Sequence, residues 1–95
     1  MYTVKRMLEF DEWFESLKDG MTRIRLDKVQ RGLLGDAEPV GEGVYEMREF
    51  FGPGWRMYYV ERDGRLIVLL GGGDKSTQQS DILRAIVLSK NLEGV

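Results

Sequence analysis

The sequence predicts a small α+β domain, spanning residues 1–95, whose elements follow the order β-α-α-β-β-β-α. Three observations lead to this prediction. Apolar residues recur at helical spacing between positions 10 and 17, turn signals at 52–54 and 63–64 separate runs of β-forming residues, and a last helical pattern follows position 76. A chain of 95 residues can bury one hydrophobic core but not two.

Residues 2–20 are predicted to form a strand and then a helix. Tyr2 to Met7 contains β-forming side chains and is interpreted as a short first strand. The helix carries an apolar stripe at i, i+3, i+4 and i+7, made of Phe10, Trp13, Phe14 and Leu17. The pair Asp19-Gly20 is expected to end this helix, because glycine readily adopts a positive φ.

A second helix is expected from about Met21 to Leu33. Its apolar stripe consists of Leu26, Val29 and Leu33. It would fold back along the first helix as an αα-hairpin. Residues 35–43 contain three glycines and a proline, which predicts a loop.

Three strands are predicted next, over Val44 to Phe50, Trp55 to Glu61 and Arg65 to Leu70. The pair Asp63-Gly64 between the last two is a strong hairpin signal. Residues 66–70 are apolar on both faces, as expected of a strand that is covered on both sides.

The glycine run at residues 71–73 is expected to break the third of these strands. Ser76-x-x-Gln79 then resembles a capping box for a last helix that runs to about Leu92. Its buried stripe is expected to consist of Ile82, Leu83 and Ile86.

Composition excludes several classes of chemistry. The absence of cysteine excludes disulfides, zinc–thiolate sites and thiol nucleophiles, and the absence of histidine excludes a Ser-His-Asp triad and imidazole acid–base catalysis. No acidic segment has calcium-loop spacing, so no metal or other cofactor is expected. No apolar run reaches the ~18 residues needed to span a bilayer. The first ten residues do not resemble a secretory signal, so a cytoplasmic protein without a membrane partner is expected.

Charge is nearly balanced overall but segregated locally. The formal net charge of −2 argues against broad, nonspecific binding of nucleic acid. Residues 9–19 are mostly acidic, whereas residues 23–31 are mostly basic. The basic residues are Arg23, Arg25, Lys28 and Arg31. The two segments form either solvated helix faces of opposite sign or one focused basic face.

The hairpin around residues 52–54 is the most informative segment. A register centred on it places Arg48 opposite Arg56 and Glu46 opposite Tyr58 on one face, because side chains alternate along a strand. Opposed arginines repel by a few tenths to ~1 kcal/mol unless an anion or the carboxylates Glu46 and Glu49 neutralise them. An ordinary mixed-charge solvent face is the alternative, and a one-residue slip would separate the arginines. The side chains expected on the other face, toward the helices, are those of Met47, Met57 and Tyr59.

A second candidate site lies in residues 71–77, GGGDKST, between a strand and a helix. Backbone N–H groups at a helix start favour phosphate, and glycines allow a close approach. The spacing is not that of a P-loop. The alternative is a tight turn capped by Asp74, Ser76 or Thr77, which would leave Lys75 without an explanation.

Three segments together resemble a known family. They are PVGEGVYEMR at 39–48, GPGWRMYY at 52–59 and LLGGGDKSTQ at 69–78, and they follow Phe10, Trp13, Leu17 and the basic segment that ends in Leu34-Gly35-Asp36. The sequence resembles the RelE/ParE toxin superfamily and, more closely, its HigB-like addiction module killer protein branch. The resemblance covers about residues 8–90.

The resemblance implies a compact fold with a curved, mainly antiparallel sheet, two N-terminal helices packed on one face and a C-terminal helix. It also implies the toxin of a type II toxin–antitoxin module, without a cofactor. Its expected partners are a cognate antitoxin, of helix-turn-helix type and encoded adjacently, and the ribosome with its mRNA. RelE and HigB members cleave mRNA in the ribosomal A site.

The resemblance also assigns candidate residues. Arg56 aligns with the arginine that stabilises the phosphate, Arg48 with a basic strand residue of the active face, and Lys75 with the basic residue after the final strand. Glu46 and Tyr58 are further catalytic candidates, for proton handling or orientation. The basic segment at 23–31 is a candidate for binding RNA phosphate, or alternatively an acidic segment of the antitoxin.

Three functions stay open at this point, because the superfamily includes both mRNA endonucleases and gyrase poisons. The first is a ribosome-dependent mRNA endonuclease that inhibits translation. The second is a non-enzymatic, ParE-like gyrase poison. The third is an attenuated toxin that acts only as an antitoxin-binding protein.

Overall fold

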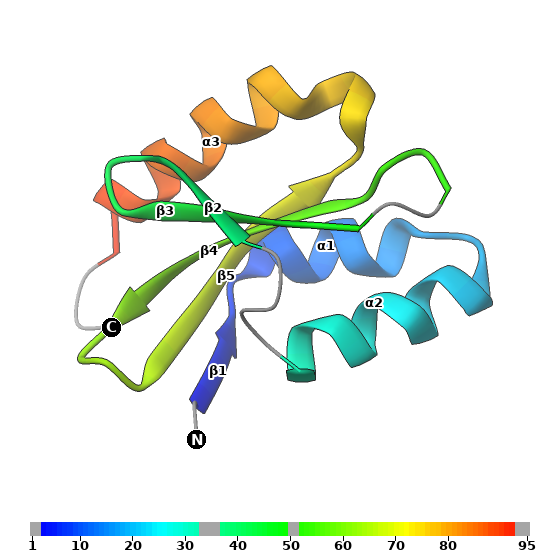
Figure 1. Ribbon diagram of the computed structural model, residues 1–95, viewed down its shortest axis with the longest axis horizontal. Helices are drawn as coiled ribbons and strands as arrows, with labels where there is room; N and C mark the ends of the chain where they lie inside the picture. The colour runs from blue at the N-terminus through cyan, green and yellow to red at the C-terminus, as the bar shows by residue number, and fades with distance from the viewer. Residues whose placement is uncertain (1–2, 33–36, 50–51, 93–95) are drawn as a thin grey trace.

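The computed structural model describes residues 3–32, 37–49 and 52–92, with only the backbone for residues 28–32. Nine elements follow one another in these described residues (Figure 1). They are β1 (Thr3–Arg6), α1 (Leu8–Ser16), α2 (Gly20–Gly32), β2 (Ala37–Gly41), β3 (Val44–Arg48), β4 (Arg56–Arg62), β5 (Leu66–Gly73), the 3₁₀ turn η1 (Lys75–Thr77) and α3 (Gln78–Lys90). None of the described helices is long and apolar enough to cross a membrane.

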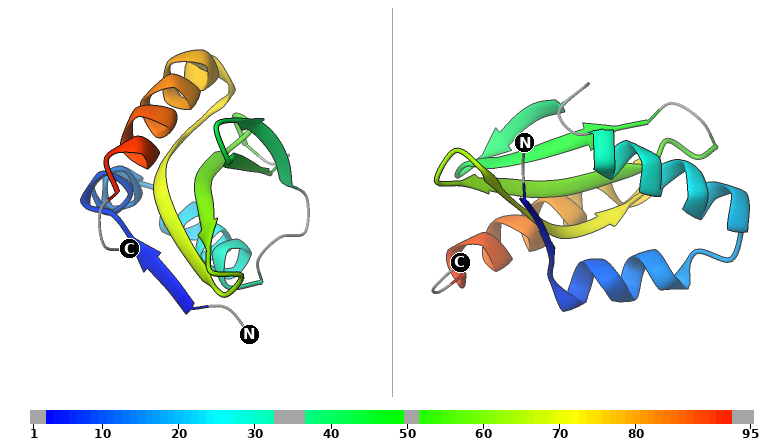
Figure 2. Two further views of the ribbon diagram at one scale, coloured as in Figure 1. Left: turned by 90° about the vertical axis from the view of Figure 1, so that its left-hand side faces the viewer. Right: turned by 90° about the horizontal axis from the view of Figure 1, so that it is seen from below.

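The strands form one sheet in the order β1-β5-β4-β3-β2. β1 pairs with β5 in parallel, and the other three pairings are antiparallel. The sheet twists strongly and the helices lie on both of its faces, as Figure 2 shows from two directions. The predicted α+β class, with a mainly antiparallel sheet, is therefore confirmed.

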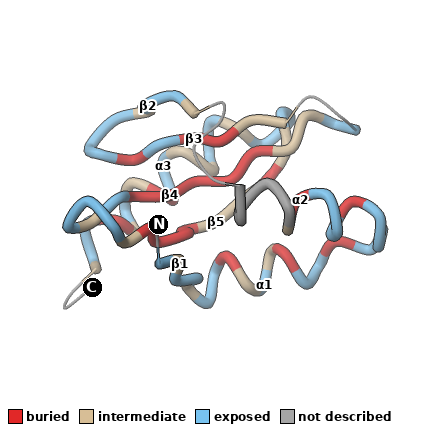
Figure 3. The backbone as a smooth tube through the Cα atoms, turned by 60° about the horizontal axis from the view of Figure 1, so that its bottom comes forward, coloured by how far each residue is buried: buried red, intermediate tan, exposed pale blue. Residues whose placement is uncertain are grey.

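Each face of the sheet has its own apolar cluster. On one face, side chains of α1 and Leu26 of α2 pack against Met47, Met57 and Tyr59. On the other face, Ala85 of α3 packs with Val44, Tyr58, Val60, Val68 and Leu70. Figure 3 shows that buried residues follow β4 and β5, which separate the two clusters. The expected alternation of β3 and β4, with the methionines toward the N-terminal helices, is confirmed.

The loop predicted at 35–43 is largely a strand. Residues 37–41 form β2, which pairs with β3 through Glu38 opposite Glu46 and Ala37 opposite Met47, while residues 35–36 lie outside the described part. Pro39 is tolerated because β2 is an edge strand, where a missing N–H need not break a ladder bond. The register shifts between Pro39 and Gly41, so a bulge accompanies the glycine that suggested a loop.

The glycine run does not break β5, contrary to the prediction. The strand continues to Gly73, and Gly71, Gly72 and Gly73 pair with residues 58, 57 and 56 of β4. Gly72 is required by packing, and Gly73 is closely packed against side chains. A Cβ at Gly72 would overlap the ring of Trp13 in α1, and one at Gly73 would overlap the carboxylate of Asp81 in α3.

The junction between α1 and α2 differs from the prediction. Asp19 does not end α1, which stops at Ser16; it begins α2, where its carboxylate accepts hydrogen bonds from the N–H of Met21 (3.0 Å) and the hydroxyl of Thr22 (2.9 Å). Short polar side chains favour this helix-start position, and Gly20 needs no positive φ there.

The last helix starts from a different cap than the predicted Ser76-x-x-Gln79 box. Asp74 caps η1 by accepting from the N–H of Ser76 at 2.8 Å, and α3 then runs to Lys90 rather than Leu92. Leu83 is 63% exposed, so it does not belong to the buried stripe. The buried positions of α3 are Ala85 and Ser89, with Ile82 and Ile86 partly buried beside the second cluster.

Candidate functional site

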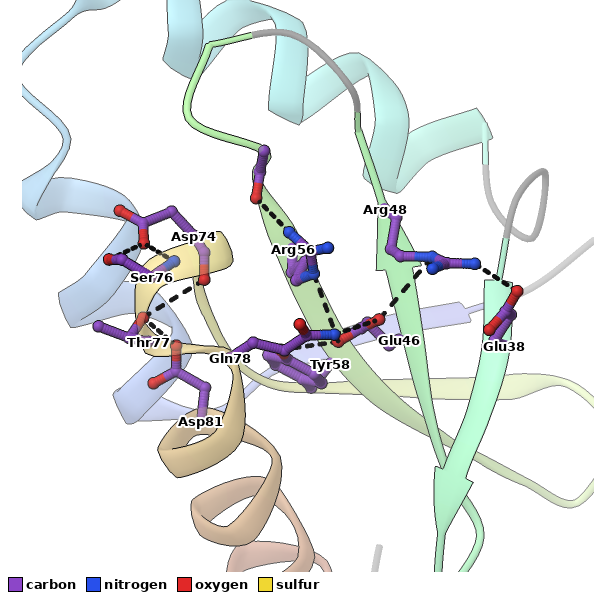
Figure 4. Close-up of polar contacts among 11 residues, drawn as sticks. Glu38, Glu46, Arg48, Arg56, Tyr58, Asp74, Ser76, Thr77, Gln78 and Asp81 are labelled. Atoms are coloured by element: carbon purple, nitrogen blue, oxygen red, sulfur yellow. Dashed lines mark hydrogen bonds and ion pairs between the residues drawn. The ribbon is translucent and has the colours of Figure 1, made fainter.

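The register of β3 and β4 builds the site. Arg48 lies opposite Arg56, and Glu46 lies opposite Tyr58, as the hairpin pattern predicted. All four side chains lie on the sheet face that α3 covers, with the close-up in Figure 4 showing them between β2 and the start of α3.

The turn at 63–64 that joins β4 to β5 also has the conformation that its sequence predicts. Asp63 and Gly64 both have positive φ, and the N–H of Arg65 bonds the carbonyl of Arg62 at 3.2 Å.

Glu46 is the centre of the polar contacts in this site. Its carboxylate is only 2% exposed and accepts hydrogen bonds from the Tyr58 hydroxyl at 2.9 Å and from Nε2 of Gln78 at 3.0 Å. It also faces Nε of Arg56 at 3.6 Å and Nε of Arg48 at 3.8 Å. A buried carboxylate is costly unless paired and hydrogen-bonded, and these four contacts meet both conditions.

The two opposed arginines are held apart by different partners. Arg56 is almost fully buried, and its Nη1 donates to the carbonyl of Gly54 at 2.8 Å. Arg48 is half-buried, and its Nη2 forms an ion pair with Glu38 on β2. Carboxylates therefore neutralise the pair, as one of the two sequence interpretations required, although Glu38 replaces the expected Glu49 in this role. The Nε atoms of both arginines are buried and make no hydrogen bond to any of the described residues.

Tyr58 cannot ionise readily at this position. Burial, and then its hydrogen bond to the Glu46 carboxylate, raises the pKa of the Tyr58 phenol well above its usual range. The hydroxyl is thus a fixed donor to Glu46 at neutral pH. The ring is fully buried in the apolar cluster on the α3 side of the sheet, so it offers no surface to a ligand.

An open pocket of about 340 Å³ lies at the tip of the β3–β4 hairpin. Arg48, Arg56 and Lys75 line it, together with the carboxylate-bearing Glu49. The rest of its wall consists of Gly52, Pro53 and Gly54. The N–H of Lys75 bonds the carbonyl of Pro53 at 3.4 Å, which ties the start of η1 to the hairpin. The structure therefore brings the three predicted phosphate-binding cations to one pocket.

The glycine-rich turn before α3 is a capped turn and not an open anion cradle. The N–H of Ser76 donates to the Asp74 carboxylate, and the N–H of Thr77 donates to the Asp74 carbonyl at 3.3 Å. The hydrogen bond from the Ser76 hydroxyl lowers the pKa of Asp74, as expected when the charged form is the one stabilised. Of the two sequence interpretations, the capped turn is the one observed, and it presents Lys75 to the pocket.

The basic segment does not join this pocket. Arg23 and Arg25 are exposed on α2, which lies on the sheet face opposite α3 (Figure 2). The side chains of Lys28 and Arg31 lie outside the described part of the chain. Whether this helix face binds RNA phosphate or an acidic antitoxin segment stays a prediction.

Sequence reasoning missed two residues of the site. Glu38 fell within the predicted loop, so its pairing with Arg48 was not foreseen. Gln78 belongs to one of the motif segments, but no local pattern indicated that it would reach Glu46, 32 residues earlier in the chain. Among the described residues, no group of three or more His, Cys, Asp or Glu side chains could hold a metal ion.

Comparisons with known proteins place the chain beside two others. It is 39% identical over 93 residues to an uncharacterized protein of Haemophilus influenzae, with 94% of each chain covered. A mutant of the E. coli toxin RelE, in its free state, has a similar structure, with a TM-score of 0.67 over 96% of this chain and 98% of that one. The sequence identity to RelE is 14%, so this likeness concerns the fold. No protein-family model matches the chain.

Proposed function

This chain belongs to one family with the Haemophilus influenzae protein and has the RelE fold, and from that premise we propose that it is the toxin of a type II toxin–antitoxin module. We place it in the HigB-like branch, with a cognate antitoxin of helix-turn-helix type as its partner. Its activity would be cleavage of mRNA on the ribosome, in the cytoplasm. The observation that carries this proposal is the pocket that gathers Arg48, Arg56 and Lys75 on one end of the sheet.

The reaction suits a pocket of cations. The 2′-hydroxyl oxygen of a ribose attacks the adjacent phosphorus, the bond to the 5′-oxygen breaks, and a cyclic phosphate forms. The attacking hydroxyl loses one proton and the departing oxygen gains one, so no co-reactant is consumed. Negative charge grows on the phosphoryl oxygens in the transition state, and preorganised donors stabilise it most where their positions are already fixed.

Arg56 is the best preorganised of the three cations. Its guanidinium is fixed by the Gly54 carbonyl and by Glu46, so it can contact a phosphate without first losing side-chain freedom. Lys75 is exposed at the pocket rim and adds a mobile positive charge. Glu46 and Tyr58 are buried and do not line the pocket, so in this proposal they are positioning residues rather than groups that touch RNA.

Induced expression with mapping of transcript ends tests the proposal. The parent chain should arrest growth and leave mRNA with new ends within codons, whereas Arg56→Ala should remove both effects. Removing one such donor typically costs ~2.7–4 kcal/mol of transition-state stabilisation, which is roughly a hundred- to a thousandfold in rate. Arg65→Ala is the matched control, because Arg65 is exposed in the turn between β4 and β5. Growth arrest by Arg56→Ala equal to that of the parent would exclude the assigned role.

One observation favours the non-enzymatic alternatives. The sequence has no histidine, and both Glu46 and Tyr58 are buried, so neither can reach a ribose hydroxyl directly. A gyrase poison or an attenuated, antitoxin-binding toxin would need the charged pocket only for contact. Growth arrest with DNA-damage signalling and intact transcripts would identify the gyrase poison. Tight binding to a neighbouring gene product without growth arrest would identify the attenuated toxin.

A further inference from the structure

Charges of alternating sign form a line across three strands. Glu38 lies on β2, Arg48 and Glu46 lie on β3, and Arg56 lies on β4. Glu38 is paired directly with Glu46, and Arg48 directly with Arg56, so each register pair joins like charges. Like charges directly opposite one another destabilise a sheet. Arg48 relieves the repulsion between Glu38 and Glu46, because it forms an ion pair with each of them.

The guanidinium of Arg48 is turned toward the sheet edge. Figure 4 shows its terminal nitrogens reaching toward β2 and Glu38, whereas Arg56 reaches toward the tip of the hairpin. Arg48 nonetheless lines the pocket together with Arg56 and Lys75. A ligand in that pocket can therefore use both terminal donors of Arg48 only if the ion pair between Arg48 and Glu38 breaks.

We infer that Glu38 is an internal competitor for Arg48, which sets the affinity of the pocket for a phosphate group. The Glu38 carboxylate contacts Nη2 of Arg48, one of the donors that a phosphate would use. A phosphate in the pocket replaces it, because guanidinium binds both oxyanions in the same forked geometry. This inference rests on the proposed function for the identity of the ligand, and it adds a residue that controls how tightly that ligand binds.

The two ion pairs of Arg48 differ in how easily they exchange. Glu38 is 60% exposed on an edge strand, and pairs of this kind contribute only ~0.2–1 kcal/mol. Glu46 is buried and bound by Tyr58 and Gln78, so it stays in place. The exposed partner is thus the one that a ligand displaces, and the buried partner keeps the stem of Arg48 beside the pocket.

Titration with inorganic phosphate tests the inference, with the side-chain Nε–H signals of the arginines observed by NMR at constant ionic strength. Glu38→Gln should bind phosphate about two- to fivefold more tightly than the parent, the factor that matches loss of an exposed ion pair. Glu42→Gln is the matched control, since Glu42 is 57% exposed and paired with Lys90 at 3.2 Å. It makes the same change in net charge and also breaks one exposed ion pair.

Each outcome of the titration decides the question. Tighter binding by Glu38→Gln alone, with the Arg48 signal shifting, supports the inference. Equal effects of the two variants would overturn it, because the change in net charge alone would then explain the tighter binding. It would also be overturned if Glu38→Gln had no effect on phosphate binding, or if the Arg48 signal did not respond to phosphate in any variant. Addition of Arg48→Ala should abolish the advantage of Glu38→Gln. A chain that shows the Glu38 effect but leaves transcripts intact would keep this inference and lose the endonuclease.

Discussion

The hydroxyl of Tyr58 donates a 2.9 Å hydrogen bond to the carboxylate of Glu46 across the β3–β4 ladder, and neither side chain is more than 2% exposed. This contact fixes the anion on which both arginines of the pocket depend. It belongs to the packing of the sheet and to the candidate site at once, so substitutions there affect stability and binding together.

Tyr58→Phe should destabilise the protein by about 1–3 kcal/mol, because it removes one donor from a carboxylate that water cannot reach. Urea unfolding followed by tryptophan fluorescence measures the change. Tyr45→Phe is the control, since Tyr45 is partly exposed and stacks on Tyr59 with ring centroids 5.5 Å apart. Equal losses in the two variants would show that the bond to Glu46 contributes nothing of its own.

Alkaline pH should lower the stability of the parent by more than it lowers that of Tyr58→Phe. The pKa of Tyr58 is raised in the folded state above its ordinary value of 10.0, so the unfolded chain releases this proton first. The stability that the neutral phenol contributes is fully present below pH 10.0 and is lost as the pH rises above it. Urea midpoints measured from neutral to strongly alkaline pH should fall more steeply in the parent. Parallel pH profiles of the two proteins would contradict the shift.

The glycines of β5 should respond unequally to alanine. Gly72→Ala forces a methyl group into the Trp13 ring and should cost about 1–3 kcal/mol, the usual range for overpacking a core. Gly71→Ala is the neighbouring control, since no atom of the described residues, apart from its chain neighbours, lies within 4 Å of the methyl group that alanine would add. Thermal unfolding of both variants measures the difference. A Gly71→Ala variant as unstable as Gly72→Ala would point to the backbone rather than to the tryptophan.

Period-two alternation and the turn glycines predicted the hairpin register that is observed, whereas a one-residue slip would have placed the two arginines on opposite faces. The same reliance on glycine and proline failed at β2 and at the end of β5. Pro39 fits an edge strand, and Gly72 provides room for Trp13; both facts depend on which elements become neighbours in space. Local sequence does not contain that information.

The residues of the candidate site that lie on the hairpin could be predicted from the sequence, and those from other elements could not. Arg48, Arg56, Glu46 and Tyr58 follow from one hairpin, so their grouping could be derived from spacing alone. Glu38 and Gln78 reach the same cluster from an unforeseen strand and from a helix beyond the hairpin. The signals for them would have been the need of two opposed arginines for a second anion, and the need of a buried carboxylate for more than one donor.

The pocket is assembled from parts that leave the ribosome at different times. The β3–β4 hairpin, with both of its arginines, is synthesised before Lys75 and Gln78, and β1 pairs with β5, the last strand of the described residues. A nascent chain that has not passed residue 78 thus holds the arginines without the third cation and without the amide that secures Glu46. If the pocket carries the toxicity, the chain becomes harmful only after residue 78 has been synthesised and has folded against the hairpin.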